Sequence, residues 1–183
     1  MANVLFEVLK DKKVALVGNA QSLLEAPRPE IDDFDVVVRV NKGPLVAKKI
    51  KNIGDKTHVN LISAFHGSIN KLLPMSKHTV YMSPLKRELL SSEQKSALLF
   101  YPIEWWNELY DVIGSRPSTG CMGIDLISRF IGGGELHLFG FDFWRSATSY
   151  TGENRPGPHC PESEMSFALD KVGVNNIHGF IKY

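Results

Sequence analysis

The sequence is poor in cysteine, in net charge and in long apolar runs, and each shortage excludes a class of protein. The 183 residues include only Cys121 and Cys160, which make neither a disulfide framework nor a zinc-binding spacing. A formal net charge of +1 lacks the basic excess that is typical of nucleic-acid-binding proteins. No apolar run approaches the roughly 20 residues of a transmembrane helix, and residues 1–13 have no signal-peptide pattern. We therefore expect a cytoplasmic protein with no transmembrane segment and no nucleic-acid partner.

The chain does contain a regular alternation of strand-length apolar runs and helical patterns. Strands are predicted at 13–18, 34–40, 57–62, 79–82, 99–102 and 135–139, with 174–183 as an edge strand. One helix is predicted to begin just after residue 19 and to end before Pro27. Further helices are predicted at 86–98, 103–112, 119–131 and 162–171. This alternation is typical of a mostly parallel, doubly wound sheet with helices on both faces. Because no repeat or linker interrupts the chain, we predict a single α/β Rossmann-like domain over residues 1–183, of unknown oligomeric state.

Four polar residues directly follow predicted strands: Asn19, Asn41, Ser63 and Asp142. In a doubly wound sheet, the carboxyl ends of parallel strands face one crevice, where ligands usually bind. An asparagine offers two donors and an acceptor, so a pair of them suits a ribose and a phosphate oxygen. The alternative is that each asparagine satisfies the backbone of its own turn.

A second candidate segment begins the predicted helix at 119–131. Pro117 presets the backbone, Ser118 or Thr119 can cap the helix, and Gly120 allows a ligand to approach closely. The free N–H groups and partial positive charge of a helix start suit a phosphate group. The alternative is an ordinary capped helix start without a ligand. Gly18, at the end of the first strand, is the expected partner segment, although the glycines of a dinucleotide-binding fingerprint do not follow it.

The segment 142–160 is a long predicted loop rich in Gly, Pro, Ser and Thr, and loops of this length are usually functional or disordered. His159 lies at its far end, where a neutral imidazole suits general-base chemistry near pH 7. The alternative for His159 is a surface histidine. Trp144 and Tyr150 lie in the loop rather than in a strand, which favours contact with a ligand.

Three segments of the chain resemble the sialyl motifs of sialyltransferases, in the order in which that family has them. The large motif is matched by VGN at 17–19, FDVVVRVNK at 34–42 and GDKT at 54–57, the small motif by PSTG at 117–120 and ELHLFGF at 135–141, and the very small motif by His159 and Glu164. The chain is also similar to bacterial lipooligosaccharide sialyltransferases at Gly18, Asn19, Ser22, Leu23, Arg116, 142–144, Ser149 and Tyr150. Together these segments cover about half of the chain.

The resemblance implies the sialyltransferase variant of the GT-A architecture and an inverting glycosyl transfer. The donor would be a CMP-activated sugar, sialic acid or a related 2-keto acid sugar, and the acceptor a glycan hydroxyl. It also implies catalysis without a metal or another cofactor. The Asp-x-Asp pattern at 33–35 enters a strand at its amino end, the wrong edge of the sheet for a donor-bound metal.

The resemblance further assigns roles to individual residues. It implies nucleotide contacts for Asn19 and Asn41, a cytidine pocket at 140–142, a Tyr150 hydrogen bond to the leaving phosphate, and His159 as the base. The complete set expected to bind the donor is Gly18, Asn19, Asn41, Ser63, Arg116, Ser118, Thr119, Gly120, Gly140, Phe141, Asp142 and Trp144.

Two alternative functions stay open at this point. One is a catalytically inactive CMP-binding or nucleotide-binding module, which would bind CMP without turnover. The other is a phosphotransferase on a similar sheet, which would need Mg²⁺; the lack of a P-loop lysine counts against it.

Overall fold

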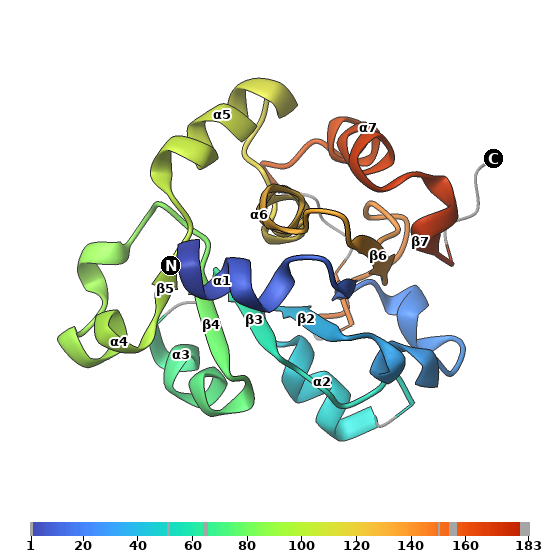
Figure 1. The fold of residues 1–183 in the computed structure, drawn as a ribbon, viewed down its shortest axis with the longest axis horizontal. Helices are drawn as coiled ribbons and strands as arrows, with labels where there is room; N and C mark the ends of the chain where they lie inside the picture. Colours follow the sequence, from blue (N-terminus) through green and yellow to red (C-terminus); the bar gives the residue numbers. More distant parts are fainter. Residues whose placement is uncertain (1, 51, 64–65, 150, 154–156, 180–183) are drawn as a thin grey trace.

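The computed structural model is organised around a parallel β-sheet (Figure 1) and describes residues 2–50, 52–63, 66–149, 151–153 and 157–179. Within these ranges the sheet has seven strands in the order β5-β4-β3-β2-β1-β6-β7, and all neighbouring pairs are parallel. The strands are β1 (Lys13–Val17), β2 (Val36–Val40), β3 (Val59–Ile62), β4 (His78–Tyr81), β5 (Leu99–Phe100), β6 (Glu135–Phe139) and β7 (Ile177–His178). The predicted parallel sheet is confirmed. The edge strand predicted at 174–183 is wrong in extent, because 174–176 form a 3₁₀ turn and only 177–178 pair with β6; residues 180–183 of that prediction lie outside the described residues.

Helices cover both faces of this sheet, as Figure 1 shows. One face carries α1 (Ala2–Leu9), α5 (Ile103–Ile113), α6 (Thr119–Phe130) and α7 (Pro161–Val172). The other carries α2 (Gly43–Ile50), α3 (His66–Leu72), α4 (Ser92–Ala97) and the short 3₁₀ turns η1 (Gln21–Leu24), η2 (Pro29–Asp33), η3 (Leu73–Met75) and η4 (Arg87–Leu89). A last 3₁₀ turn, η5 (Val174–Asn176), precedes β7. Of the helices in the described ranges, none is long and apolar enough to cross a bilayer.

The apolar runs form central strands because parallel strands covered on both faces must be buried on both sides. Every residue of β2 is buried, as is every residue of β3. Helix α6 lies close to the sheet because Gly123 faces it: a Cβ there would come within 2.7 Å of Leu61 and 3.3 Å of Leu16. This close packing places the start of α6 at the carboxyl edge of the central strands, where β1, β2 and β6 end.

A buried arginine in β2 fixes the turn that precedes β3. Arg39 has no exposed surface; its Nε donates to the Lys56 carbonyl at 3.0 Å, and its Nη2 donates to the carbonyls of Ile53 and Gly54 at 2.9 and 3.0 Å. From the outside, the Asp32 carboxylate accepts the Lys56 amide at 3.1 Å. Burial lowers the pKa of Arg39 to about 10 although the charge of Asp32 raises it, so the guanidinium stays charged at neutral pH.

Two predicted helices are wrong in extent. The helix expected after residue 19 is only the 3₁₀ turn η1, in which the amides of Leu23 and Glu25 donate to the carbonyls of Ala20 and Ser22, three residues earlier. The amides of Gln21 and Ser22 donate to the Ala147 carbonyl and the Ser146 hydroxyl, so the start of the turn is tied to the distant loop.

The helix expected at 86–98 is divided into η4 and α4. Leu90 is extended, and Ser91 begins a new helix with a capping box: its hydroxyl accepts the Gln94 amide, and the Gln94 side chain accepts the Ser91 amide. Ser-x-x-Gln is a recognised helix-start signal, so the break is readable from the sequence. Helices α1, α2 and α3 are not among the predicted helices.

Candidate functional site

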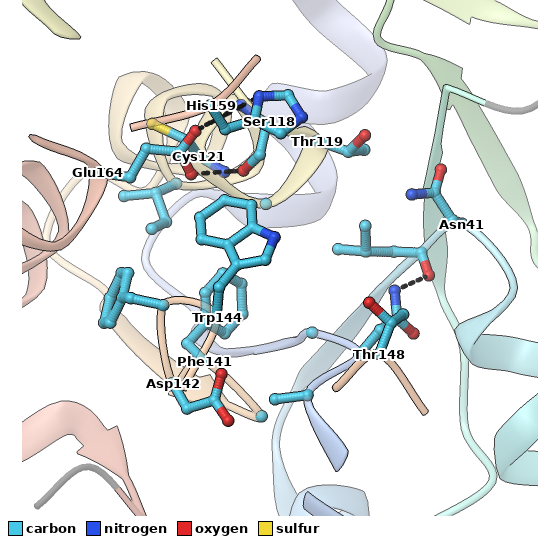
Figure 2. A pocket seen from close by; sticks show the side chains of 18 of the residues that line it. Asn41, Ser118, Thr119, Cys121, Phe141, Asp142, Trp144, Thr148, His159 and Glu164 are labelled. Atoms are coloured by element: carbon cyan, nitrogen blue, oxygen red, sulfur yellow. Dashed lines mark hydrogen bonds and ion pairs between the residues drawn. The ribbon is translucent and has the colours of Figure 1, made fainter. Parts of the chain in front are cut away.

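A cavity opens at the carboxyl edge of the sheet (Figure 2), between the ends of β1, β2 and β6, the start of α6, and the loop that leads into α7. The predicted site residues that line it are Gly18, Asn19, Asn41, Ser118, Thr119, Gly120, Gly140, Phe141, Asp142, Trp144 and His159. The lining also includes Ala20, Val40, Cys121, Ile124, Phe143, Ser146, Thr148 and Glu164. The structure therefore brings segments that are remote in sequence around one cavity.

Two predicted residues reach the cavity only through a neighbour. The Ser63 hydroxyl accepts a hydrogen bond from the Thr119 hydroxyl at 2.9 Å, and the Arg116 carbonyl contacts the His159 ring at 2.7 Å. Neither Ser63 nor Arg116 is part of the lining. Tyr150 lies outside the described residues.

The two asparagines tie neighbouring strands together instead of closing their own turns. Nδ2 of Asn19 donates to the carbonyl of Val40 at 2.9 Å, which joins the ends of β1 and β2. Oδ1 of Asn41 accepts the Ser63 amide at 2.8 Å, which joins the ends of β2 and β3. Asn41 has a φ of 51°, in the left-handed region, and Figure 2 shows its amide across the cavity from Trp144. The turn-satisfying alternative is therefore not what these side chains do.

The Phe141 ring explains two of the site glycines. A Cβ on Gly120 would lie 2.8 Å from Cε1 of Phe141, and one on Gly18 would lie 2.5 Å from the Gly140 carbonyl and 3.0 Å from Phe141 Cε2. The ring thus packs where these glycines leave room for it. We expected Gly120 to admit a ligand; in the structure the position that its missing side chain leaves open is filled by Phe141.

The start of the long loop is held by a carboxylate. Oδ2 of Asp142 accepts hydrogen bonds from the Ser22 hydroxyl at 3.1 Å, from the Ser146 amide at 3.0 Å and from the Ser146 hydroxyl. Phe143 and Trp144 then both adopt left-handed backbone conformations, with φ of 53° and 61°. Non-glycine residues rarely adopt this conformation, so the surrounding contacts impose it and turn the Trp144 indole into the cavity (Figure 2).

The His159 imidazole is oriented by a backbone carbonyl and an aromatic ring. Nδ1 lies 2.7 Å from the Arg116 carbonyl, which can only accept, so Nδ1 carries the proton and the neutral ring has its lone pair on Nε2. The ring stacks on Trp144 at 5.6 Å between centroids and 24° between planes. Burial lowers the pKa of His159; the bond to Arg116 raises it and the Arg116 charge lowers it. His159 is therefore a neutral base near pH 7.

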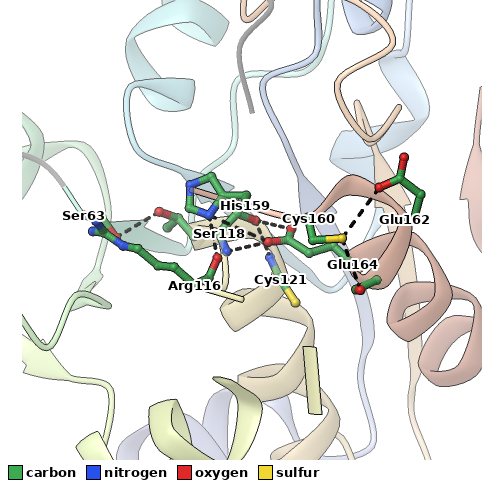
Figure 3. A network of polar contacts seen from close by, with 10 residues as sticks. Ser63, Arg116, Ser118, Cys121, His159, Cys160, Glu162 and Glu164 are labelled. Atoms are coloured by element: carbon green, nitrogen blue, oxygen red, sulfur yellow. Dashed lines mark hydrogen bonds and ion pairs between the residues drawn. The ribbon is translucent and has the colours of Figure 1, made fainter. Parts of the chain in front are cut away.

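Glu164 lines the cavity but is absent from the expected set of site residues, although it was matched to the very small motif. It is 4% exposed, and its carboxyl accepts the Ser118 amide at 2.7 Å and the Ser118 hydroxyl at 2.5 Å (Figure 3). The same hydroxyl accepts the Cys121 amide at 3.1 Å and so caps α6. The available sequence signal was its spacing from His159.

Burial raises the pKa of Glu164 to about 7, although both bonds from Ser118 favour the charged form. Oε1 of Glu164 lies 4.0 Å from Nδ1 of His159. Because the histidine is neutral and the carboxyl is partly protonated near pH 7, this contact is not an ion pair there.

Replacing Glu164 with glutamine should make stability less dependent on pH. The native protein keeps a proton that the unfolded chain, with an ordinary glutamate pKa of 4.5, has released, so stability falls as pH rises through about 7. Glutamine mimics the protonated carboxyl. The difference in unfolding free energy, variant minus wild type, should therefore rise by on the order of 3 kcal/mol between about pH 4.5 and pH 8. Urea unfolding followed by circular dichroism measures it.

Glu162→Gln is the matched control, because Glu162 is an exposed carboxyl in the first turn of the same helix. If both variants differed from the wild type by the same pH-dependent amount, the pH dependence of stability could not be assigned to Glu164.

The Asp-x-Asp pattern lies at the amino edge of the sheet, as predicted, since Oδ2 of Asp35 accepts the amide of Lys13 at the start of β1. Among the residues described, no three His, Cys, Asp or Glu side chains are grouped to hold a metal ion. Metal-independent catalysis stays a prediction.

The known proteins that this chain resembles in sequence and in structure are sialyltransferases. No protein-family model matches the chain. In sequence, it is 24% identical over 205 residues to the mouse CMP-N-acetylneuraminate-beta-galactosamide-alpha-2,3-sialyltransferase 1. That alignment covers 92% of this chain but only 59% of the mouse protein.

The similarity of the backbones decides the fold. A mammalian sialyltransferase crystal structure superposes with a TM-score of 0.64 at 19% identity, over 91% of this chain and 68% of that one. The fold is that of the sialyltransferases. The sialyltransferase CstII from Campylobacter jejuni, solved with the substrate analogue CMP-3FNeuAc, matches with a TM-score of 0.59 at 15% identity, over 87% and 78% of the two chains. The family resemblance found in the three motifs is confirmed at the level of the sialyltransferase fold.

Proposed function

We propose that this chain transfers sialic acid, or a related 2-keto acid sugar, from its CMP donor to a glycan hydroxyl. The observation that supports the proposal most directly is the convergence of Asn19, Thr119 and His159 on one cavity. These residues come from the end of β1, the start of α6 and the loop before α7. The similarity to the mouse sialyltransferase and the sialyltransferase fold give the donor class.

In the proposed reaction, the acceptor hydroxyl attacks the anomeric carbon from the side opposite the phosphate. The new bond joins the acceptor oxygen to that carbon, the bond from the carbon to the phosphate oxygen breaks, and CMP leaves with the electron pair. Nε2 of His159 takes the hydroxyl proton, since Nδ1 already donates to Arg116. A positioned general base of this kind contributes typically about 10²–10⁴-fold. Inversion at the anomeric carbon follows from the direct attack.

The start of α6 suits the anionic part of the donor. The Ser118 hydroxyl accepts the Cys121 amide, and the Ser118 carbonyl accepts the Met122 amide. Neither accepts the amides of Thr119 and Gly120, two residues that line the cavity. Backbone amides and the positive end of the helix dipole together favour a phosphate or carboxylate. We propose that these neutral donors, with no metal ion, stabilise the charge that develops on the departing phosphate. The resemblance adds Tyr150 as a further donor.

Incubation with CMP-sialic acid tests the proposal. CMP release should be faster with a galactoside acceptor than without one, should persist in EDTA, and should yield a sialylated product detectable by mass spectrometry. CMP binding by calorimetry without any release would instead establish the inactive nucleotide-binding module. Loss of turnover in EDTA with recovery in Mg²⁺ would contradict metal independence and favour the phosphotransferase alternative.

A further inference from the structure

The central strand β3 contains one polar residue, Asn60, at a position that is fully buried. Its strand neighbours are Val59, Leu61 and Ile62, all buried and apolar. Burying an amide is unfavourable unless hydrogen bonds replace those it made with water. A leucine would fill a similar volume in this strand without that penalty, so packing alone does not account for an asparagine here.

The hydrogen bond that Asn60 makes leads to the cavity. Nδ2 of Asn60 donates to the backbone carbonyl of Asn41 at 3.3 Å. Its Oδ1 has no hydrogen-bond partner among the protein groups described, and neither has Nη1 of Arg39, the residue paired with Asn60 on β2. The one protein contact that uses the polarity of Asn60 is therefore the contact with Asn41.

Asn41 is a residue whose backbone has to be held. Its φ of 51° is one that non-glycine residues rarely adopt. Three bonds surround it: its amide donates to the Leu61 carbonyl at 2.8 Å, its Oδ1 accepts the Ser63 amide at 2.8 Å, and its carbonyl accepts from Asn60. Rotation of this peptide would move the Asn41 side chain, which lines the cavity.

We propose that Asn60 is a positioning residue for nucleotide binding: from the interior of the sheet it fixes the backbone of Asn41, and so the amide that faces the donor. The inference deepens the proposed function, because it assumes that Asn41 contacts the nucleotide. Asn60 itself touches no ligand.

Asn60→Asp and Asn60→Leu test this role from two directions. Aspartate has the same size, and its ionised carboxylate cannot donate to Asn41. Leucine removes both polar groups. Both variants share only the loss of the donor to Asn41. The matched control is Thr79→Val, since Thr79 is the buried residue paired with Asn60 on β4 and its hydroxyl contacts Ser76 instead.

Calorimetric titration with CMP should show a dissociation constant about tenfold higher in both Asn60 variants and unchanged in Thr79→Val. The KM for the CMP-sugar should rise by the same factor while kcat and the acceptor KM stay near wild type, because the lost contact is made equally in the ground and transition states. A merely structural role would not produce this split.

Either Asn60 variant that folds and binds CMP like the wild type overturns the proposal. Failure of both variants to fold overturns it as well, because Asn60 would then be a residue that the sheet requires. A wild-type protein that does not bind CMP would instead defeat the proposed function, which keeps the two failures distinguishable.

Discussion

Replacing His159 with alanine should lower kcat by about 10²–10⁴-fold while the dissociation constant for CMP changes little. The expected loss is large because Nε2 is the proposed proton acceptor and Nδ1 is already committed to the Arg116 carbonyl. CMP release from the donor in the presence of acceptor measures kcat, and calorimetry measures CMP binding.

His159→Asn separates the chemical role from a structural one. Its amide nitrogen can replace the Nδ1 donor to Arg116, but it has no basic group in place of Nε2. Activity that returns in His159→Asn would show that the histidine only holds the loop, and would contradict a general-base role.

In the wild type, kcat/KM should fall only as pH drops below the ordinary histidine pKa of 6.5, because burial lowers the pKa of His159 and the ring stays neutral down to that pH.

Replacing Arg39 with methionine should lower the free energy of unfolding by about 3–5 kcal/mol, because three backbone carbonyls lose their donor and each buried acceptor left unsatisfied costs about 1–3 kcal/mol. Methionine replaces the aliphatic stem of the side chain but leaves the carbonyls of Ile53, Gly54 and Lys56 without their donor. The melting temperature should fall by roughly 10 °C or more. Urea unfolding and a thermal melt followed by circular dichroism measure both quantities.

Arg39→Lys should be intermediate, because an ammonium group keeps the charge but cannot reproduce the planar set of donors. The matched control is Arg28→Met, which removes an arginine whose partner Glu30 lies 3.4 Å away in a partly exposed ion pair, and which should lose less than about 1 kcal/mol. An Arg39→Met protein as stable as the wild type would show that the turn at 53–56 does not depend on the guanidinium.

Most of the sheet was predictable because its signals are local. β2 reads as an unbroken apolar run apart from Arg39, which is what a parallel strand buried on both faces requires. The start of α6 was readable from Ser118, whose hydroxyl accepts the Cys121 amide as a helix cap. Because parallel strands end at one edge, the polar residues that follow them were also correctly expected to lie near one another.

The errors occurred where distant contacts decide the local structure. The segment after Asn19 has helical composition, but Ser22 donates to Asp142, 120 residues further along the chain, and the segment stops at a 3₁₀ turn. Glu164 reads as an ordinary acidic residue in the first turn of α7. Its burial depends on Ser118, 46 residues earlier, and no periodicity in the sequence reveals that contact.

The roles of the site residues come from the family resemblance, and their positions come from the structure. The structure places His159, Asn41 and Thr119 at one cavity, whereas the resemblance alone assigns them to base, nucleotide and donor. The Asn19 amide illustrates the difference, because it was predicted as a nucleotide contact and its Nδ2 already donates to Val40.

The outermost strands β5 and β7 each pair over only two residues, Leu99–Phe100 and Ile177–His178. An open sheet edge is a template on which another chain can add a strand, and a longer edge is a better template. With so little backbone ladder at either side of its described sheet, the protein is poorly suited to edge-to-edge polymerisation.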